Sequence, residues 1–265
     1  MRLSMAVRVW LCALSLGLCM AGAQARELVI GGIPEEPVRY VDPRDGVIKG
    51  LDVDVLAHIL GRLDVPYRIV LELSSARLES NWRRGRLYDM VFTYSLKDER
   101  TPYLLYAREA HIHNNWYFFV LKENLGRWNY QRMEDLQGLR VGATQGFSYT
   151  QEFWAAVAAG VWHTDLVTQN ALQMQKLLHR RIDTVPLPAM VTLYGARQGG
   201  YAERIGYLPK PIKSEAYYNT FVKASTYPGL AALAERYDEE LRRMKEDGSL
   251  RALYRKYGLE AHYPF

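Results

Sequence analysis

Residues 93–100 carry side chains that suit the recognition of a carboxylate. The guanidinium of Arg100 is always charged, and its fork of donors matches the two oxygens of a carboxylate. Thr93 and Ser95 lie seven and five residues before it and supply hydroxyls, and Tyr94 between them supplies an aromatic ring that suits a planar or cationic group. Alternatively, Arg100 is a surface arginine beside its acidic neighbours, the hydroxyls of Thr93 and Ser95 serve only a turn, and Tyr94 packs in the core.

A second candidate group precedes a helix that is expected to begin near Tyr149. The segment is Gln145-Gly146-Phe147-Ser148. Backbone N–H groups at a helix start attract anions, so Gly146 and Ser148 are candidates for a further ligand contact. The alternative for Ser148 is a plain helix cap.

No residue pattern indicates a catalytic or metal centre. The sequence has no G-x-S-x-G, H-E-x-x-H or phosphate-loop motif. His111 and His113 have the alternating spacing of a strand, but two histidines without a third ligand make a poor zinc site. We expect both to be exposed or hydrogen-bonded, and we predict no metal and no cofactor.

The first 25 residues have the pattern of a secretory signal peptide. Arg2 and Arg8 are followed by an apolar run over residues 9–20 and then by Ala23-Gln24-Ala25. The run is short for a membrane span, which needs roughly 20 residues, so we expect cleavage after Ala25. Cys19 raises lipidation as an alternative, although Leu18 stands where such signals carry a small residue. Both cysteines precede residue 26, so the mature chain has no disulfide or thiol chemistry.

Composition argues against a nucleic-acid partner. Without Arg2 and Arg8, the chain keeps 32 Lys and Arg against 29 Asp and Glu, a mild net charge of +3. The basic residues form no stripe, and an exported protein does not meet nucleic acid.

The order of predicted elements indicates an α/β protein. Strands at 27–32, 67–73 and 89–93 alternate with helices at 53–63 and 77–86. A second alternating unit follows from 116 to 187, and a strand at 217–223 with helices at 230–245 and 250–257 ends the chain. Such alternation predicts mainly parallel sheets flanked by helices. Two lobes of this kind facing each other would form a cleft at the carboxyl ends of their strands, able to close by hinge motion.

Five segments carry a family resemblance, in the right order and spacing. They are GVIKGLDVD at 46–54, DMVF at 89–92 with DER at 98–100, EDLQGLRVG at 134–142, RID at 181–183, and KEDGSL at 245–250 with Tyr254. The chain resembles the bacterial extracellular solute-binding proteins of family 3, the polar amino-acid-binding group that serves ABC importers.

The resemblance implies a periplasmic, two-lobed binding protein that acts as a monomer with a membrane ABC permease. Lobe 1 would comprise residues 26–115 and 218–265, and lobe 2 residues 116–217, with hinge strands near 116–120 and 217–222. It also implies that Arg100 pairs with a ligand carboxylate and that the hydroxyls of Thr93 and Ser95 bind the same group.

One position departs from the family pattern. The family's acidic residue for a ligand ammonium lies five positions beyond Asp183, and Pro188 stands there. A buried ammonium without a partner is costly. Either the ligand has no α-ammonium, or another acid such as Glu36 or Glu215 supplies the charge.

Two other functions stay open on the sequence. Some proteins with this fold are cyclohexadienyl dehydratases, which need a positioned carboxyl group, and Glu36, Glu109 and Glu215 are the candidates. A periplasmic sensor that signals to a membrane receptor is the other alternative. We predict a binding protein rather than an enzyme.

Overall fold

The computed structural model describes residues 26–147, 149–168 and 170–265. The predicted signal peptide with Cys12 and Cys19, and the candidate residue Ser148, lie outside this part of the chain. The strands are β1 (Leu28–Gly32), β2 (Tyr40–Val41), β3 (Ile48–Lys49), β4 (Tyr67–Leu71), β5 (Met90–Ser95), β6 (Leu104–Tyr106), β7 (Ile112–Leu121), β8 (Arg140–Thr144), β9 (His163–Val167), β10 (Val185–Pro188), β11 (Ile205–Tyr207) and β12 (Lys213–Val222). The α-helices are α2 (Leu51–Arg62), α3 (Ser75–Arg83), α4 (Gln151–Ala158), α5 (Asn170–Leu178), α6 (Ala189–Gln198), α7 (Leu230–Glu246) and α8 (Ser249–Lys256). Short 3-10 turns are η1 (Asp98–Arg100), η2 (Lys122–Asn124), η3 (Met133–Leu136), η4 (Ala202–Arg204) and η5 (Glu260–His262).

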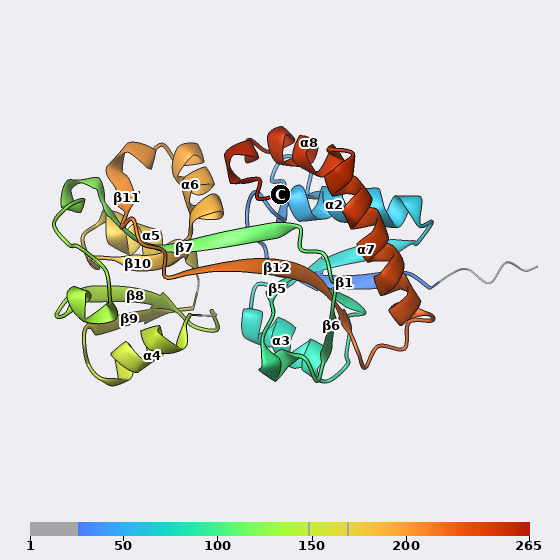
Figure 1. The fold of residues 1–265 in the computed structure, drawn as a ribbon, viewed down its shortest axis with the longest axis horizontal. Coiled ribbons are helices and arrows are strands. Elements are labelled where there is room, and N and C mark those ends of the chain that lie inside the picture. Colours follow the sequence, from blue (N-terminus) through green and yellow to red (C-terminus); the bar gives the residue numbers. More distant parts are fainter. Residues whose placement is uncertain (1–25, 148, 169) are drawn as a thin grey trace, which may run out of the picture.

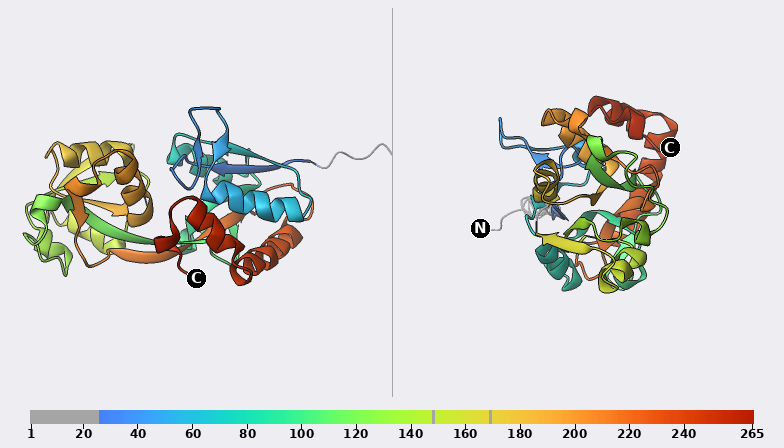
Figure 2. Two further views of the ribbon diagram at one scale, coloured as in Figure 1. Left: turned by 90° about the horizontal axis from the view of Figure 1, so that it is seen from above. Right: turned by 90° about the vertical axis from the view of Figure 1, so that its left-hand side faces the viewer.

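Two lobes lie side by side, and the long strands β7 and β12 run from one lobe to the other (Figure 1 and Figure 2). The predicted two-lobed α/β fold is confirmed. The lobe limits predicted at 115/116 and 217/218 fall within these two strands. They remain a prediction about where the chain hinges.

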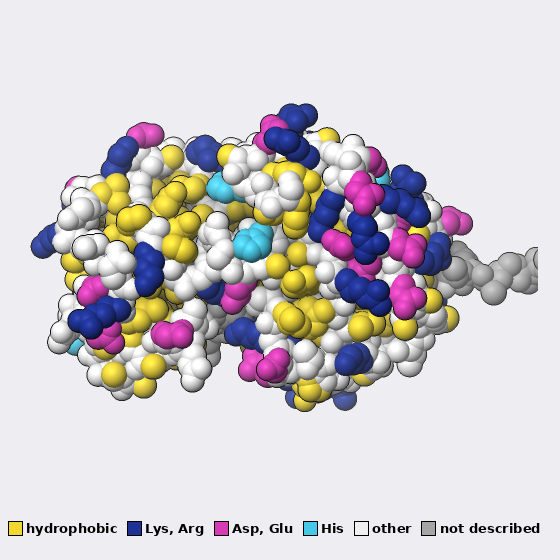
Figure 3. Space-filling view, in the orientation of Figure 1, with side chains coloured by type: hydrophobic (Ala, Val, Ile, Leu, Met, Phe, Trp, Pro, Cys, Tyr) yellow, Lys and Arg dark blue, Asp and Glu magenta, His cyan; other side chains and the backbone are white. Residues whose placement is uncertain are grey.

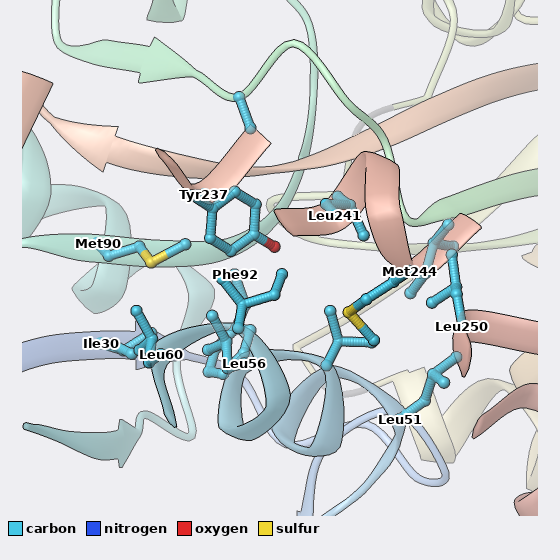
Figure 4. Close-up of a cluster of buried hydrophobic side chains, with 14 of the residues drawn as sticks. Ile30, Leu51, Leu56, Leu60, Met90, Phe92, Tyr237, Leu241, Met244 and Leu250 are labelled. Carbon is cyan, nitrogen blue, oxygen red and sulfur yellow. The ribbon is translucent and has the colours of Figure 1, made fainter. Parts of the chain in front are cut away.

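Lobe 1 is built on parallel strands in the order β5-β1-β4. Side chains of a strand alternate between its two faces. Leu28 and Ile30 of β1 therefore join the cluster formed with α2, α7 and α8, whereas Val29 packs on the other face with Trp82 of α3. Figure 4 shows the larger cluster, in which α2 contributes Leu56 and α7 contributes the buried Tyr237.

Lobe 2 repeats this arrangement around the far half of β7. Phe118 and Val120 pack on one face with α4, and Phe119 and Leu121 pack on the other with α5 and α6. Strands β8 and β9 pair in parallel, and an isolated parallel bridge joins Val141 to Thr184 beside β10. Both faces of each sheet are thus covered by helices, as in other α/β proteins.

The connecting strands turn the sheet into a mixed one. Every antiparallel pair of the eight-stranded sheet involves β7 or β12 within the described residues. The two strands pair with each other from Lys213 opposite Trp116 to Tyr217 opposite Ile112. Parallel pairing is confined to the interior of each lobe.

Both connecting strands begin four residues earlier than the sequence predicts. Polar residues at 113–115 and 213–215 interrupt the apolar pattern there, although these segments pair as a regular ladder. Helix α6 was not predicted, because residues 189–198 show no one-sided apolar stripe and contain Gly195. Its buried residues lie at its two ends.

Charged side chains of both signs lie over α7 and α8 (Figure 3). Several of them form ion pairs, such as Arg242 with Glu109 at 3.2 Å and Arg255 with Glu260 at 3.0 Å. The face in view carries no continuous basic stripe. Across the three described ranges, no helix combines the length and the apolar character that a membrane span requires.

Candidate ligand-binding site

A cavity of about 710 Å³, partly open to solvent, lies between the two lobes. The end of β5 and the turn η1 form its floor, the connecting strands form one wall, and the segment after β8 forms another. Its lining residues are Ile33, Glu35, Arg39, Ser75, Leu78, Phe92, Thr93, Tyr94, Ser95, Arg100, Asn114, Trp116, Phe147, Pro188 and Tyr217. Four of the six predicted site residues are among them.

Arg100, Ser95 and Tyr94 form one interacting unit in this cavity. The side chain of Arg100 is buried, and its Nη1 donates to the backbone oxygen of Ser95 at 3.2 Å and to Ser95 Oγ at 3.4 Å. The guanidinium lies 5.0 Å from the centre of the Tyr94 ring. Tyr106 also donates to the Ser95 oxygen, at 3.0 Å. The guanidinium is therefore held in place before any ligand arrives.

Tyr94 is fixed from below by Trp82. The indole Nε1 of Trp82 donates to the Tyr94 hydroxyl at 2.9 Å, and the two rings meet edge to face. Burial raises the pKa of Tyr94 to about 12, so the hydroxyl stays neutral at physiological pH. The face of this ring attracts the guanidinium of Arg100 through the ring quadrupole.

Thr93 lines the cavity, and its hydroxyl also takes part in a buried network. Its hydroxyl donates to Asp52 Oδ2 at 2.7 Å and accepts from Arg39 Nη1 at 2.8 Å, so it serves a buried network in this structure.

The backbone of Thr93 has φ of 53°, a strained value for a β-branched residue. Its N–H donates to Asn219 Oδ1 at 3.2 Å, where the pairing of β12 with β5 shifts register. This irregularity turns the end of β5 toward the cavity.

The network around Asp52 lies directly behind the cavity. Asp52 is fully buried, its Oδ1 lies 2.8 Å from Nε2 of His111, and its Oδ2 accepts from Arg39. Burial alone would raise the pKa of Asp52, but His111 and Arg39 hold it below its ordinary value. The prediction that His111 is hydrogen-bonded is confirmed.

Gly50 allows this network to form. Its φ is 135°, and a Cβ at this position would clash with the backbone oxygen of Val38, so a side chain is excluded. The close approach lets the N–H of Asp52 donate to the Val38 oxygen at 2.8 Å, which places Arg39 beside the start of α2. Arg39 was not predicted as a site residue, since nothing in its flanking loop marks it.

Gly146 brings lobe 2 against lobe 1. It has φ of 80°, and a Cβ at this position would lie 2.8 Å from Ser75 Oγ at the start of α3. The neighbouring Phe147 lines the cavity and packs edge to face with Trp116. Gly146 thus lies at a contact between the lobes next to the cavity.

We expect Gly146→Ala to weaken ligand binding by about two-fold to ten-fold, because it strains a left-handed residue and crowds Ser75. The measurement is isothermal titration calorimetry with the carboxylate that binds most tightly. Ser75→Ala removes the crowding but leaves the strain, so the double variant should recover part of the affinity. If the double variant bound the ligand no more tightly than Gly146→Ala alone, the lobes would not close at this contact.

Trp116 is a core residue that also faces the cavity. It is buried against Phe147 and Tyr149. Its Nε1 donates to the Tyr217 hydroxyl at 3.2 Å. The ammonium of Lys213 lies 4.7 Å from the Trp116 ring centre, and burial lowers the pKa of this lysine.

The acidic residues proposed from the sequence, as partners of a ligand ammonium or as catalytic groups, lie in different parts of the structure. Glu215 accepts from Lys213 at 3.0 Å, and Glu109 accepts from Lys245 at 2.7 Å on α7. Pro188 lines the cavity, and Glu36 lies in a neighbouring one. The acid that lines the main cavity is Glu35, whose pKa is raised by burial. Glu35 was not among the predicted candidates, whereas its neighbour Glu36 was.

Solved structures with the same architecture are numerous. The chain superposes on a putative L-cystine ABC transporter protein from Listeria monocytogenes with a TM-score of 0.74 and 19% identity, covering 91% of this chain and 99% of the other. It matches a mutant of ArgBP from T. maritima with a TM-score of 0.70 and 21% identity over 87% and 94% of the two chains. A histidine kinase sensor domain gives 0.73 and 19% over 88% and 96%. The TM-scores of these superpositions establish a common fold.

The sequence itself establishes the family. No curated protein sequence matches this chain at a significant level. The family model described as bacterial extracellular solute-binding proteins, family 3, matches residues 28–260. This span includes every element of both lobes from β1 to α8. The chain therefore belongs to the bacterial extracellular solute-binding proteins of family 3.

Proposed function

We propose that this protein captures a small carboxylate-bearing solute between its lobes in the periplasm and delivers it to an ABC importer. The observation that carries the proposal is Arg100, buried in a cavity lined by both lobes and fixed by Ser95 and Tyr94. A buried guanidinium at such a place is suited to a carboxylate, because charge-assisted, bidentate hydrogen bonds are strong where water is excluded.

Binding would proceed in two steps. The ligand carboxylate first meets Arg100 on lobe 1, and bending of β7 and β12 then brings Phe147 and Pro188 of lobe 2 onto the ligand. A ligand shifts the equilibrium toward the closed form only by its difference in affinity for the two forms. The importer would recognise that closed form.

The ion pairs of Glu109 and Glu215 argue against a catalytic role for these two carboxylates. Each carboxylate is already engaged by a lysine, so neither is placed to protonate a leaving group. The test is to incubate purified protein with its tightest carboxylate ligand, and separately with prephenate and arogenate, and to analyse the mixtures by chromatography. We expect the compounds to be recovered unchanged. Consumption of prephenate or arogenate would replace the proposal with a dehydratase.

A further inference from the structure

A second cavity of about 810 Å³ adjoins the first. Ile33, Glu35 and Phe147 line both cavities. Because three side chains face the two spaces at once, the cavities are neighbouring compartments of one groove between the lobes.

The two compartments differ in charge. The first holds Arg100 and Arg39, and the charge of Arg39 is matched by its pairing with the buried Asp52. The second is lined by Glu35 and Glu36, and none of the described residues that line it is Lys or Arg. Its remaining lining is mostly apolar, from residues including Met174, Leu187 and Val191. The groove therefore has a positive end, a negative end and apolar walls.

Glu35 stands at the junction of the compartments. Its contact with Arg39 is long, at 3.5 Å between Oε2 and Nη2, and Arg39 is more closely bound to Asp52 and Thr93. A carboxylate with only a distant partner gains from a cationic ligand group.

Asn114 adds an acceptor in the first compartment. Its Oδ1 is buried and receives no hydrogen bond from the described residues. A buried acceptor left without a donor is costly, so a ligand N–H donor would relieve it.

Apart from Glu35 at the edge shared with the second compartment, none of the described residues that line the Arg100 compartment is Asp or Glu. Pro188, which lines the same compartment, is apolar. We propose that the solute is an ω-amino or ω-guanidino carboxylate, with its carboxylate on Arg100, its cationic group near Glu35 and Glu36, and methylenes along the apolar walls between them. This inference rests on the proposed function and specifies its ligand class.

Three five-carbon probes test the inference by calorimetry on the purified protein. They are 5-aminopentanoate, its isomer 2-aminopentanoate, and pentanoate without an amine. We expect 5-aminopentanoate to bind at least about ten-fold more tightly than either of the others. Chain length is then varied from 3-aminopropanoate to 6-aminohexanoate, with 4-guanidinobutanoate as the guanidino probe, and a maximum at an intermediate length is expected.

Variants assign the cationic end. Glu35→Gln should weaken 5-aminopentanoate by about ten-fold and leave pentanoate unchanged, and Glu36→Gln should act in the same direction with a smaller effect. Glu123→Gln, which breaks an exposed pair with Arg180, is the matched control and should change neither.

The pH dependence gives an independent readout. Burial raises the pKa of Glu35, the charges of Arg39 and Asp52 act on its carboxyl, and Tyr217 is a further titratable group that interacts with it. The ionised form binds a cation, so the affinity for 5-aminopentanoate should rise as pH increases through the Glu35 pKa. Glu35→Gln should flatten this rise.

The outcomes separate this inference from the proposed function. Tighter binding of 2-aminopentanoate, or equal binding of pentanoate and 5-aminopentanoate through Arg100, would overturn the inference and leave the proposed function standing. If no carboxylate bound at all, both would fail. Equal losses for pentanoate and 5-aminopentanoate in Glu35→Gln would also overturn it, since they would mark a purely structural glutamate.

Discussion

Replacing Arg100 with alanine is expected to weaken carboxylate binding by about 30-fold to several thousand-fold. Removing one partner of a buried, hydrogen-bonded charge pair costs about 2–5 kcal/mol, because the other charge stays buried without a partner. Arg100 is buried, and Ser95 and Tyr94 fix its guanidinium. We therefore expect that no other side chain takes over its contact with the carboxylate in the variant. Calorimetric titration of the wild-type protein and the variant with the same carboxylate measures the loss.

Two further variants control this experiment. Arg251→Ala removes an exposed arginine that pairs with Glu260, and it should leave affinity unchanged. Arg100→Lys keeps the charge but loses the bidentate fork, so it should recover only part of the affinity. Circular dichroism verifies that each variant is folded. Wild-type affinity in a folded Arg100→Ala protein would remove Arg100 from the site.

Replacing Asp52 with alanine is expected to give a loss of about 3–5 kcal/mol in the free energy of unfolding. The change leaves the buried Arg39 without its closest carboxylate, and breaking a buried ion pair in this way is strongly destabilising. Thr93 and His111 lose a partner as well. Thermal unfolding should show a fall in Tm on the order of 10 °C.

Asp54 provides a matched control on the same helix. Both aspartates lie in the first turn of α2 and share its favourable dipole, but Asp54 pairs with Lys256 at the surface. Asp54→Ala should therefore lower the unfolding free energy by only about 1 kcal/mol or less. Similar losses for the two variants would show that the buried network contributes little.

The pH dependence of stability has a defined sign for Asp52. Its pKa is lower in the folded protein than in the unfolded chain, so its ionised form stabilises the fold at pH values above about 3.9. The stability difference between wild type and Asp52→Asn should be constant above about pH 5. It should shrink as the pH falls through the Asp52 pKa of the folded state.

The α/β order and most elements of the lobes could be predicted because their apolar residues repeat with the period of a helix or a strand. Helix α2 is an example, with Val55, Leu56, Ile59 and Leu60 all fully buried. The first half of β7 could not be predicted in this way, since His113, Asn114 and Asn115 carry polar side chains, and Asn114 lines the cavity between the lobes. The pattern fails where the sheet leaves the core of a lobe.

Part of the candidate site was predictable because its residues lie close together in the sequence. Ser95 and Arg100 are five residues apart, and a short turn is enough to bring them together. Glu35, Arg39 and Asn114 come from distant segments, and only the tertiary fold places them on one cavity. The hydrogen bonds of Thr93 to Asp52 and Arg39 could not be predicted from its residue type, because its partners come from distant segments.

A thermal-shift screen of the purified protein tests most directly whether the protein binds a carboxylate through Arg100. The compounds are carboxylates with and without amino groups, together with sugars and polyamines that lack a carboxylate. A ligand at 100 times its Kd stabilises the folded state by about 2.7 kcal/mol, which raises the Tm of a protein of this size by several degrees. We expect such a shift with at least one carboxylate, and we expect the shift to be lost in Arg100→Ala. Shifts with sugars or polyamines alone, and with no carboxylate, would contradict it.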